Sequence, residues 1–264
     1  MGVETQVEQA VERVERETEH MRGRHRAVER FADRVADVRP AADGAGRPAT
    51  DGGVVLSPGM GGASTREGGC AEVRECFAET VAPYSTADLD GSESLVETIS
   101  EEFNEAVALA LSPATGADFS PATKRAVITA AEERGREIKA MLAALDRERE
   151  SLAEAAETVG EITAWLTEAN EQPLLELGFE ELIDRHRRID SFRASCDDLA
   201  RDRQRTLRTT TAEQGSAAIE HEQLLALLYD EFPTEFPVLT TVARLGSLFE
   251  QSQRALRDHL VRRV

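Results

Sequence analysis

Apolar residues in the first forty positions of the chain recur at steps of three and four. This spacing puts them on one face of a helix and repeats as a heptad, the pattern of helices that pack in coiled coils. Pro40 ends the pattern, because proline disfavours helical geometry in the residue before it. We therefore predict a helix over residues 3–38. Its seam positions, seven of them apolar, are Val7, Val11, Val14, Thr18, Met21, His25, Val28, Ala32 and Val35.

The longest helical pattern begins at Ser120 and Pro121, an N-cap residue followed by proline at the first helical position. Its apolar stripe predicts a helix over residues 121–169. Gly178 precedes a second pattern, which predicts a helix over residues 179–209. The seam of this second helix contains Leu182, His186, Ile189, Arg193, Cys196, Ala200 and Leu207.

Charge on these two helices favours pairing them as an antiparallel hairpin. Residues 132–161 carry nine acidic and five basic side chains, whereas residues 184–208 carry eight arginines and five aspartates. The two stretches therefore have opposite net signs. Each exposed ion pair contributes only about 0–1 kcal/mol, and less in salt.

Four shorter patterns have the same helical period. Each of them is bounded by proline or glycine. The sequence has no segment with the alternating apolar and polar pattern of a β-strand. The sequence thus predicts an all-α fold: an elongated helical bundle with a long antiparallel coiled-coil hairpin and a compact helical end. We expect the short helices within residues 70–112 and 218–261 to form that end. The four helices are predicted over residues 70–81, 92–111, 218–231 and 238–260.

Residues 40–69 differ from the rest, because they hold nine of the 18 glycines and three of the nine prolines. Such a stretch loses much backbone entropy on ordering, so we predict a flexible loop with Val54-Val55-Leu56 as a short extended piece. The organisation expected within one helical domain is an N-terminal coiled-coil helix (residues 1–39), this loop (40–69), short helices (70–117), the hairpin (118–211) and a C-terminal helical pair (212–264).

The chain is strongly acidic, with 50 Asp and Glu against 31 Lys and Arg in 264 residues, a formal charge of −19. Only Lys124 and Lys139 are lysines; the other cations are arginines. Molar salt screens the repulsion between carboxylates, and it strengthens the association of apolar surface such as the long side-chain stem of lysine. A carboxylate-rich, lysine-poor surface therefore suits molar salt. We favour a halophilic protein. The alternative is a moderately acidic mesophilic protein from a GC-rich genome.

The first twenty residues lack the apolar core of a signal peptide, and the whole sequence lacks an apolar window of 18 residues. The three cysteines are too few and odd in number for a disulfide framework. These observations predict a soluble, cytoplasmic protein.

Candidate chemical sites are weak. Cys70 and Cys76 lie six apart, a spacing unlike that of zinc ligands. Cys196 and His186 lie ten apart on one helix, about 15 Å along its axis and too far to form a nucleophile–base pair. The glycines of Gly59-Met60-Gly61-Gly62 lack the lysine and hydroxyl of a phosphate-binding loop. We predict no catalytic residues, metal site or cofactor, and no enzyme activity.

The arginines of the 179–209 helix are the best candidates for binding a partner. They suit an anionic partner such as a nucleic acid or a receptor, although the overall acidity disfavours nucleic acid. The alternative is that they pair with nearby carboxylates on a solvated face. The candidates are Arg185, Arg188, Arg201, Arg203, Arg205 and Arg208.

Four segments give the chain a recognisable signature: Arg74 to Val81 (RECFAETV), Phe119 to Val127 (FSPATKRAV), Leu228 to Pro233 (LYDEFP) and Arg257 to Arg263 (RDHLVRR). With them, nearly the whole chain resembles an uncharacterised family of acidic helical proteins from haloarchaea. The resemblance implies a halophilic helical protein and no particular activity.

The function that the sequence favours is therefore that of a non-enzymatic interaction or scaffold protein acting through coiled-coil surfaces, including self-association. The alternative is a signalling or regulatory protein that binds an anionic partner through the arginine-rich helix. We expect no insertion into a membrane.

Overall fold

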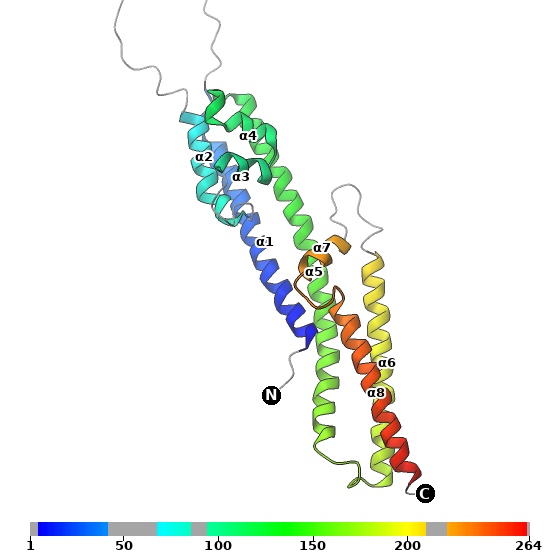
Figure 1. The fold of residues 1–264 in the computed structure, drawn as a ribbon. Coiled ribbons are helices and arrows are strands. Elements are labelled where there is room, and N and C mark those ends of the chain that lie inside the picture. The colour runs from blue at the N-terminus through cyan, green and yellow to red at the C-terminus, as the bar shows by residue number, and fades with distance from the viewer. Residues whose placement is uncertain (1–4, 42–67, 86–93, 210–220, 263–264) are drawn as a thin grey trace, which may run out of the picture. The chain divides into compact units, whose positions relative to one another are not determined.

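The computed structural model describes residues 5–41, 68–85, 94–209 and 221–262, and the elements within these ranges are helices and turns (Figure 1). The all-α prediction is confirmed for this part of the chain. The helices are α1 (Gln6–Asp37), α2 (Gly68–Thr80), α3 (Leu95–Glu102), α4 (Glu105–Leu111), α5 (Pro121–Asn170), α6 (Phe179–Thr209), α7 (His221–Leu228) and α8 (Pro237–Val261), with short 3-10 turns η1 (Ala82–Tyr84) and η2 (Pro113–Thr115).

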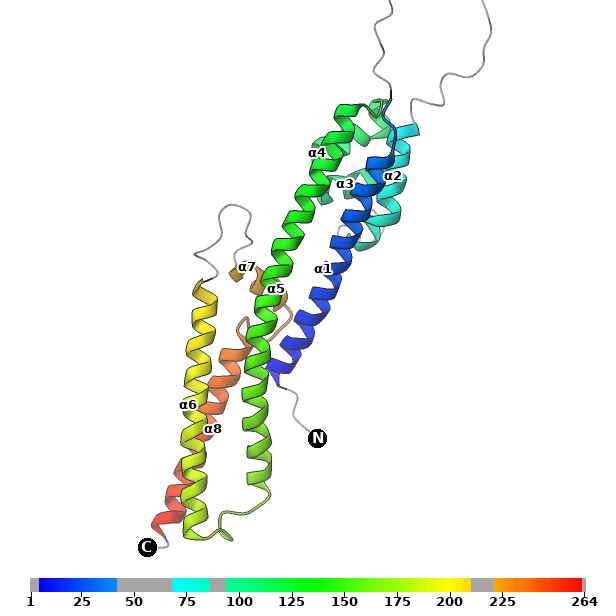
Figure 2. The ribbon, with the colours of Figure 1, turned by 180° about the vertical axis from the view of Figure 1, so that it is seen from behind.

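The long helices begin and end within a few residues of their predicted positions. At the start of α5, the Ser120 hydroxyl accepts a hydrogen bond from the Thr123 amide at 3.0 Å, which satisfies one of the unpaired donors of a first turn. At its other end, residues 171–178 reverse the chain into α6. Figures 1 and 2 both show α5 and α6 running antiparallel from this turn. The helical hairpin is thus present, and its coiled-coil packing stays a prediction.

The single helix predicted over residues 92–111 is instead two helices, α3 and α4, which meet at Phe103 and Asn104. The Asn104 carboxamide accepts a hydrogen bond from the Val107 amide at 2.9 Å and starts α4 as its N-cap. Phe103 stacks on Phe31 with ring centroids 5.3 Å apart. The apolar stripe was continuous in sequence, but a capping residue and an aromatic anchor divide it.

Helix α2 begins at Gly68, two residues before the predicted start. A side chain at Gly69 would place its Cβ 2.6 Å from the Cβ of Phe119. Glycine is therefore required at this position, because the backbone of α2 lies directly on Phe119. The predicted loop features at residues 54–56 and 59–62 lie outside the described residues.

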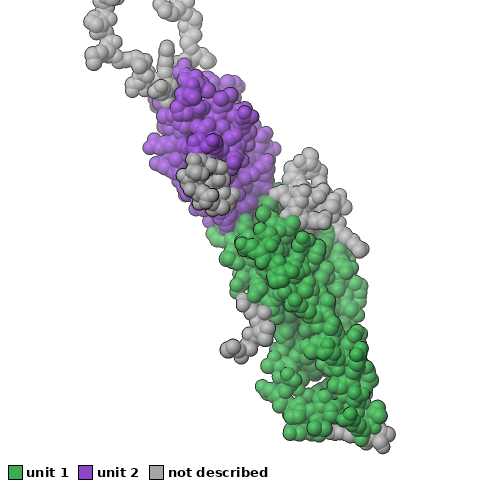
Figure 3. Space-filling view, viewed as in Figure 1, with its two compact units in different colours: residues 1–19, 140–264 green, residues 20–139 purple. Residues whose placement is uncertain are grey.

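The chain divides into two compact units (Figure 3). Unit 1 consists of Met1–Glu19 and Ala140–Val264, and unit 2 consists of His20–Lys139. Helices α1 and α5 contribute residues to both units. The short helices α2, α3 and α4 belong to unit 2, while α7 and α8 belong to unit 1.

The core of unit 2 is built on an aromatic cluster that joins α1, α2 and the α3–α4 junction. Phe77 meets Phe31 at 5.8 Å and Phe103 at 5.7 Å, both edge to face. At the end of α1, the Lys124 ammonium donates to the carbonyl of Val38 at 2.8 Å. A cation at this position complements the negative end of the helix dipole.

In unit 1 the hairpin is completed by α8, which packs most closely against α6. The rings of Phe192 on α6 and Phe249 on α8 stack with centroids 6.3 Å apart, and Trp165 of α5 meets Phe192 edge to face at 5.4 Å. The first turns of α1 reach this unit as well, since Arg13 Nε donates to the carbonyl of Leu228 at 3.3 Å.

Candidate functional site

Two charged residues lie on the buried seam of the hairpin in unit 1. Glu148 follows Leu145 by three positions and precedes Leu152 by four, and Arg203 follows Cys196 by seven. Both are buried, Glu148 completely. Charged side chains are almost never buried in this way unless they are paired.

The two charges form a bidentate ion pair. The Arg203 guanidinium donates to both Glu148 oxygens, with N–O distances of 2.8 and 2.6 Å, and also to the Ser151 hydroxyl at 3.1 Å. The buried Tyr229 hydroxyl donates to Glu148 Oε1 at 2.6 Å. Three segments thus meet at one carboxylate: α5, α6 and the residue that follows α7.

Burial determines the chemistry of this cluster. It raises the pKa of Tyr229 well above its usual value, and the negative charge of Glu148 and the hydrogen bond to it act in the same direction. The phenol therefore stays a neutral donor. A buried pair of this kind stabilises a fold little in itself, but removing one partner is costly because the other charge is left unpaired. We assign the cluster a positioning role, since a buried carboxylate with both oxygens occupied is closed to a substrate.

The heptad spacing of the two seams contains a signal for Glu148 and Arg203. The predicted partner-binding surface includes Arg203. In the structure Arg149 is exposed and its neighbour Glu148 takes the seam position, while Arg203 is buried and hence not part of an accessible surface. The heptad spacing identifies both buried residues. Tyr229, within the helix predicted over residues 218–231, supplies the third member.

Two of the other predicted partner-binding arginines pair within α6 itself. Arg201 bonds to Asp198, and Arg205 lies 2.7 Å from Asp202, each an i,i+3 pair on an exposed face. This agrees with the alternative of a solvated face of ion pairs. The side chain of Arg208 lies outside the described residues.

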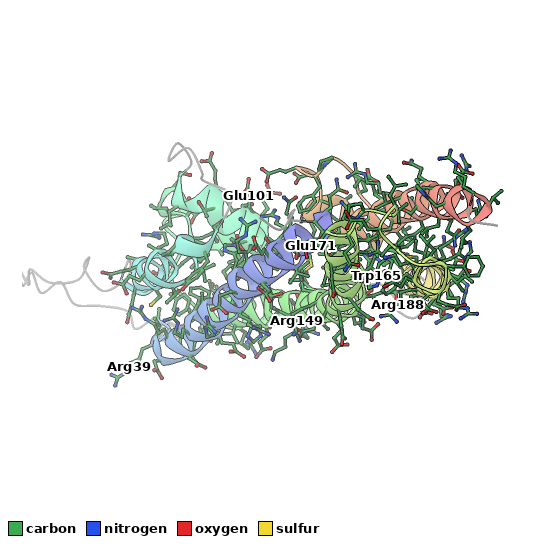
Figure 4. The ribbon with its side chains drawn as sticks, turned by 90° about the horizontal axis from the view of Figure 1, so that it is seen from below. Arg39, Glu101, Arg149, Trp165, Glu171 and Arg188 are labelled. Carbon is green, nitrogen blue, oxygen red and sulfur yellow. The ribbon has the colours of Figure 1, made fainter. Side chains whose placement is uncertain are left out.

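Arg188 is held by two neighbours. It donates to Glu161 Oε1 of α5 at 2.7 Å, and its guanidinium carbon lies 4.4 Å from the ring centroid of Phe192. Trp165 meets the same ring edge to face. Trp165 and Arg188 are both labelled in Figure 4. The contact of Arg188 with Phe192 is a cation–π interaction supported by an ion pair.

Arg185 caps the C-terminal end of α5. Its Nη1 donates to the carbonyls of Ala169 at 2.7 Å and Gln172 at 3.3 Å, and its Nη2 donates to the Gln172 side chain at 3.1 Å. These carbonyls lack partners inside the helix, and a cation there also favours the helix dipole. Arg185 therefore ties α6 to the turn of the hairpin.

Beside Arg185 a pocket of about 300 Å³ opens at the turn end of the hairpin. We call it the hairpin-end pocket. Its walls come from α5, the turn, α6 and α8, and most of its lining is apolar. The lining residues are Trp165, Leu166, Ala169, Asn170, Gln172, Pro173, Leu174, Arg185, Ile189, Leu248, Ser252, Ala255 and Leu256.

Large apolar side chains are exposed on the same segments. We define the hairpin-end patch as Leu175 in the turn, Phe179 at the start of α6, and Leu248 and Val261 on α8. Leu248 also lines the pocket. Exposed apolar side chains beside a pocket are typical of protein-binding surfaces.

The three cysteines are buried and unpaired with one another. Burial raises the pKa of Cys196 to about 11, which suits a small core residue. Within the described ranges, His, Cys, Asp and Glu nowhere form a group of three or more that could hold a metal. None of the helices searched in those ranges has the length and apolarity needed to cross a membrane.

These features define an all-helical protein in two units, with a buried Glu–Arg–Tyr cluster and an apolar pocket in unit 1. A family model described as "Domain of unknown function (DUF7260)" matches residues 5–253, so the chain belongs to this family. Membership in an uncharacterised family is thereby confirmed. Neither the curated proteins nor the solved structures gave a match to the chain.

Proposed function

We propose that the chain is a non-enzymatic interaction protein that binds a protein partner through the hairpin-end pocket and patch. The observation that carries this proposal is the exposure of Leu175, 75% accessible, beside an apolar pocket. Burying such side chains against a partner releases roughly 25 cal/mol for each Å² of apolar surface. The pocket can receive one apolar side chain of a partner, and the exposed Leu248 in its wall adds to the apolar contact.

The walls of the pocket are held in place before any partner arrives. Arg185 fixes the turn to α6, and the Glu148–Arg203 pair fixes α6 to α5 further along the hairpin. A preorganised surface loses less entropy on binding, which raises affinity for the same contacts. This supports a docking function for the end of unit 1.

We further propose that the protein works in a salt-rich cytoplasm and has a haloarchaeal origin. The charge of −19 and the predominance of arginine over lysine support this. Circular dichroism in molar KCl and in dilute buffer tests the salt requirement. A protein equally folded in both solutions contradicts it.

Site-specific photo-crosslinking in the native host tests the docking function. A photoreactive amino acid replaces Leu175 in the full chain, and the matched control carries it at Leu109 in unit 2, which is also well exposed at 61%. We expect a discrete crosslinked protein species from position 175 and none from position 109. The absence of any crosslinked protein from position 175, or equal crosslinking from both, overturns the proposal.

A further inference from the structure

We infer that the segment bound at the hairpin-end pocket belongs to another protein and carries a lysine or arginine next to its apolar side chain. The inference rests on the proposed function, because it names the chemistry of the partner for the same pocket. It is carried by a second, polar pocket that shares part of its wall with the first.

This second pocket has a volume of about 250 Å³, and we call it the acidic pocket. The last turns of α5, the turn and α6 provide its lining residues, which are Trp165, Glu168, Ala169, Glu171, Gln172 and Arg185. Four of these six also line the hairpin-end pocket: Trp165, Ala169, Gln172 and Arg185. The two pockets therefore adjoin, and neighbouring side chains of one bound segment can enter both.

The charges in the acidic pocket favour a cation. Glu168 and Glu171 are exposed, and in the described part of the chain neither carboxylate lies within ion-pair distance of an arginine or lysine. The Arg185 guanidinium is instead held by the carbonyls of Ala169 and Gln172 and by the Gln172 side chain. Two carboxylates and one guanidinium leave a net charge of −1, which one cationic side chain of a partner would neutralise.

Two further features of this wall suit a cation. Helix α5 has no basic side chain in its last turn, and the carbonyls at a helix C-terminus carry the negative end of the helix dipole. Trp165 lines both pockets, and an indole is the aromatic ring that attracts a cation most strongly. A lysine or arginine is therefore favoured here, and an acidic side chain is disfavoured.

The two pockets have separate roles in binding. Leu166 of α5, Ile189 of α6 and Leu256 of α8 line the hairpin-end pocket, so an apolar side chain buried there gains affinity that persists or grows in strong salt. The acidic pocket adds specificity for a basic neighbour, although salt screens this contribution. The charge preference should therefore be largest at the lowest salt at which the chain is folded.

The charge of the whole chain argues for a different protein as the partner. At −19, two copies of this chain repel each other wherever salt does not screen them. Nucleic acid would bring phosphates towards the carboxylates of the acidic pocket. A basic segment of another protein avoids both penalties.

Fluorescence of Trp165 gives a direct test, because it is the only tryptophan in the chain and lines both pockets. The probes are three blocked tetrapeptides, glycine–leucine–X–glycine, in which X is lysine, glutamine or glutamate. We expect dissociation constants in roughly the millimolar range for such short probes. The lysine peptide should bind roughly fivefold more tightly than the glutamate peptide, with the glutamine peptide between them.

A double variant tests the origin of that preference. Glu168→Gln with Glu171→Gln should make the three peptides bind equally within about twofold, because the attraction for a cation is lost. Glu154→Gln with Glu157→Gln is the matched control, since these glutamates have the same spacing on α5, are exposed and line neither pocket. It should keep the full preference.

Three results of the peptide titrations overturn the inference. The first is equal binding of the three peptides to the wild type, or tightest binding of the glutamate peptide. The second is a preference for lysine that survives in the Glu168→Gln, Glu171→Gln variant. The third is the absence of any response of Trp165 to the peptides.

Charge reversal in the native host separates the inference from the function on which it rests. Crosslinking from position 175 is repeated with Glu168→Arg and Glu171→Arg, and in the control with Glu154→Arg and Glu157→Arg. We expect the crosslinked protein to decrease roughly tenfold in the first case and to stay unchanged in the control. Matching circular dichroism spectra show that both variants are folded.

The possible crosslinking results have distinct meanings. Equal crosslinking in both charge-reversed variants keeps the docking function and overturns the basic partner. Crosslinks to peptides of this chain keep the docking function as well, but they make a second copy the partner and overturn the inference. Absence of any crosslinked protein from position 175 in the parent chain overturns both.

Discussion

In the described part of each unit, one buried glutamate ties three segments together, yet the surroundings of the two glutamates differ. In unit 1, Glu148 is 0% exposed and its partner Arg203 is 2% exposed. In unit 2, Glu102 of α3 is 5% exposed, but its partners Arg24 of α1 and Arg134 of α5 are 14% and 26% exposed. Arg24 donates to both carboxylate oxygens at 2.7 and 2.8 Å, and Arg134 lies at 3.4 Å.

The difference shows that burial of the partner, more than the number of ion pairs, sets the cost of losing a charge. Water can reach the arginines of unit 2 if Glu102 is neutralised, so they lose a partner but keep some solvation. Arg203 lacks this access to water, because its unpaired charge would remain in the core. The same substitution should therefore cost more in unit 1 than in unit 2.

Glu148→Gln is expected to have the largest effect on stability. It removes the charge that compensates Arg203 and should lower the free energy of unfolding of unit 1 by about 3–5 kcal/mol. Hydrogen exchange of the amides in α6, measured over a series of urea concentrations, reports the free energy of unfolding of unit 1. Glu150→Gln, on the exposed face of the same helix, is the matched control. A loss below about 1 kcal/mol would contradict the burial argument.

Tyr229→Phe should come next, at about 1.5–3 kcal/mol, because it removes one hydrogen bond to a charged buried acceptor. The pKa of Tyr229 is raised in the folded protein, so folding favours the protonated phenol. This contribution is complete below the ordinary tyrosine pKa of about 10 and is lost as the pH rises above it.

The pH profile of Tyr229→Phe supplies the control for that prediction. Relative to the variant, the wild type should lose stability between pH 10 and 12, whereas both profiles should run parallel at lower pH. Parallel profiles throughout would show that the phenol is not the group concerned.

Glu102→Gln in unit 2 is expected to cost about 1–2 kcal/mol, since its arginine partners retain access to water. Hydrogen exchange of amides in α3 and α1 reports on this unit. A cost equal to that of Glu148→Gln would remove the distinction between the two glutamates.

Arg201→Ala should have the smallest effect, less than about 0.5 kcal/mol, because its pair with Asp198 is solvent-exposed and within one helix. The urea midpoint of unit 1 measures the effect. Arg205→Ala tests a second exposed ion pair of α6, that of Arg205 with Asp202, in the same way. A larger loss would mean that the arginine-rich face contributes to the fold and is more than a solvated surface.

The helices could largely be predicted from the sequence, because their ends are set by local chemistry. Ser120 and Pro121 start α5, and Gly178 precedes α6, so both helices were placed within one residue. The break at Phe103 could not be predicted. Its apolar stripe continues through the break, and the aromatic partners Phe31 and Phe77 come from distant parts of the chain.

The candidate site was less accessible to prediction, for a physical reason. Hydrophobic periodicity treats a charged residue on a seam as a tolerated exception or assigns it to solvent. Only the packed hairpin shows that Glu148 and Arg203, 55 positions apart, occupy facing seam positions and neutralise each other. Tyr229 reaches them from 81 positions beyond Glu148, a separation that no local pattern reveals.

The sharing of α1 between the two units has a consequence for synthesis of the chain. Arg13 contacts the carbonyl of Leu228, 215 residues later. At about 5–20 residues per second, roughly 10–40 s separate the emergence of these two residues from the ribosome. Unit 2, a single continuous stretch, can begin to fold during that interval, whereas the first turns of α1 wait for their partners. The first turns of α1 are therefore expected to be among the last parts of the chain to fold.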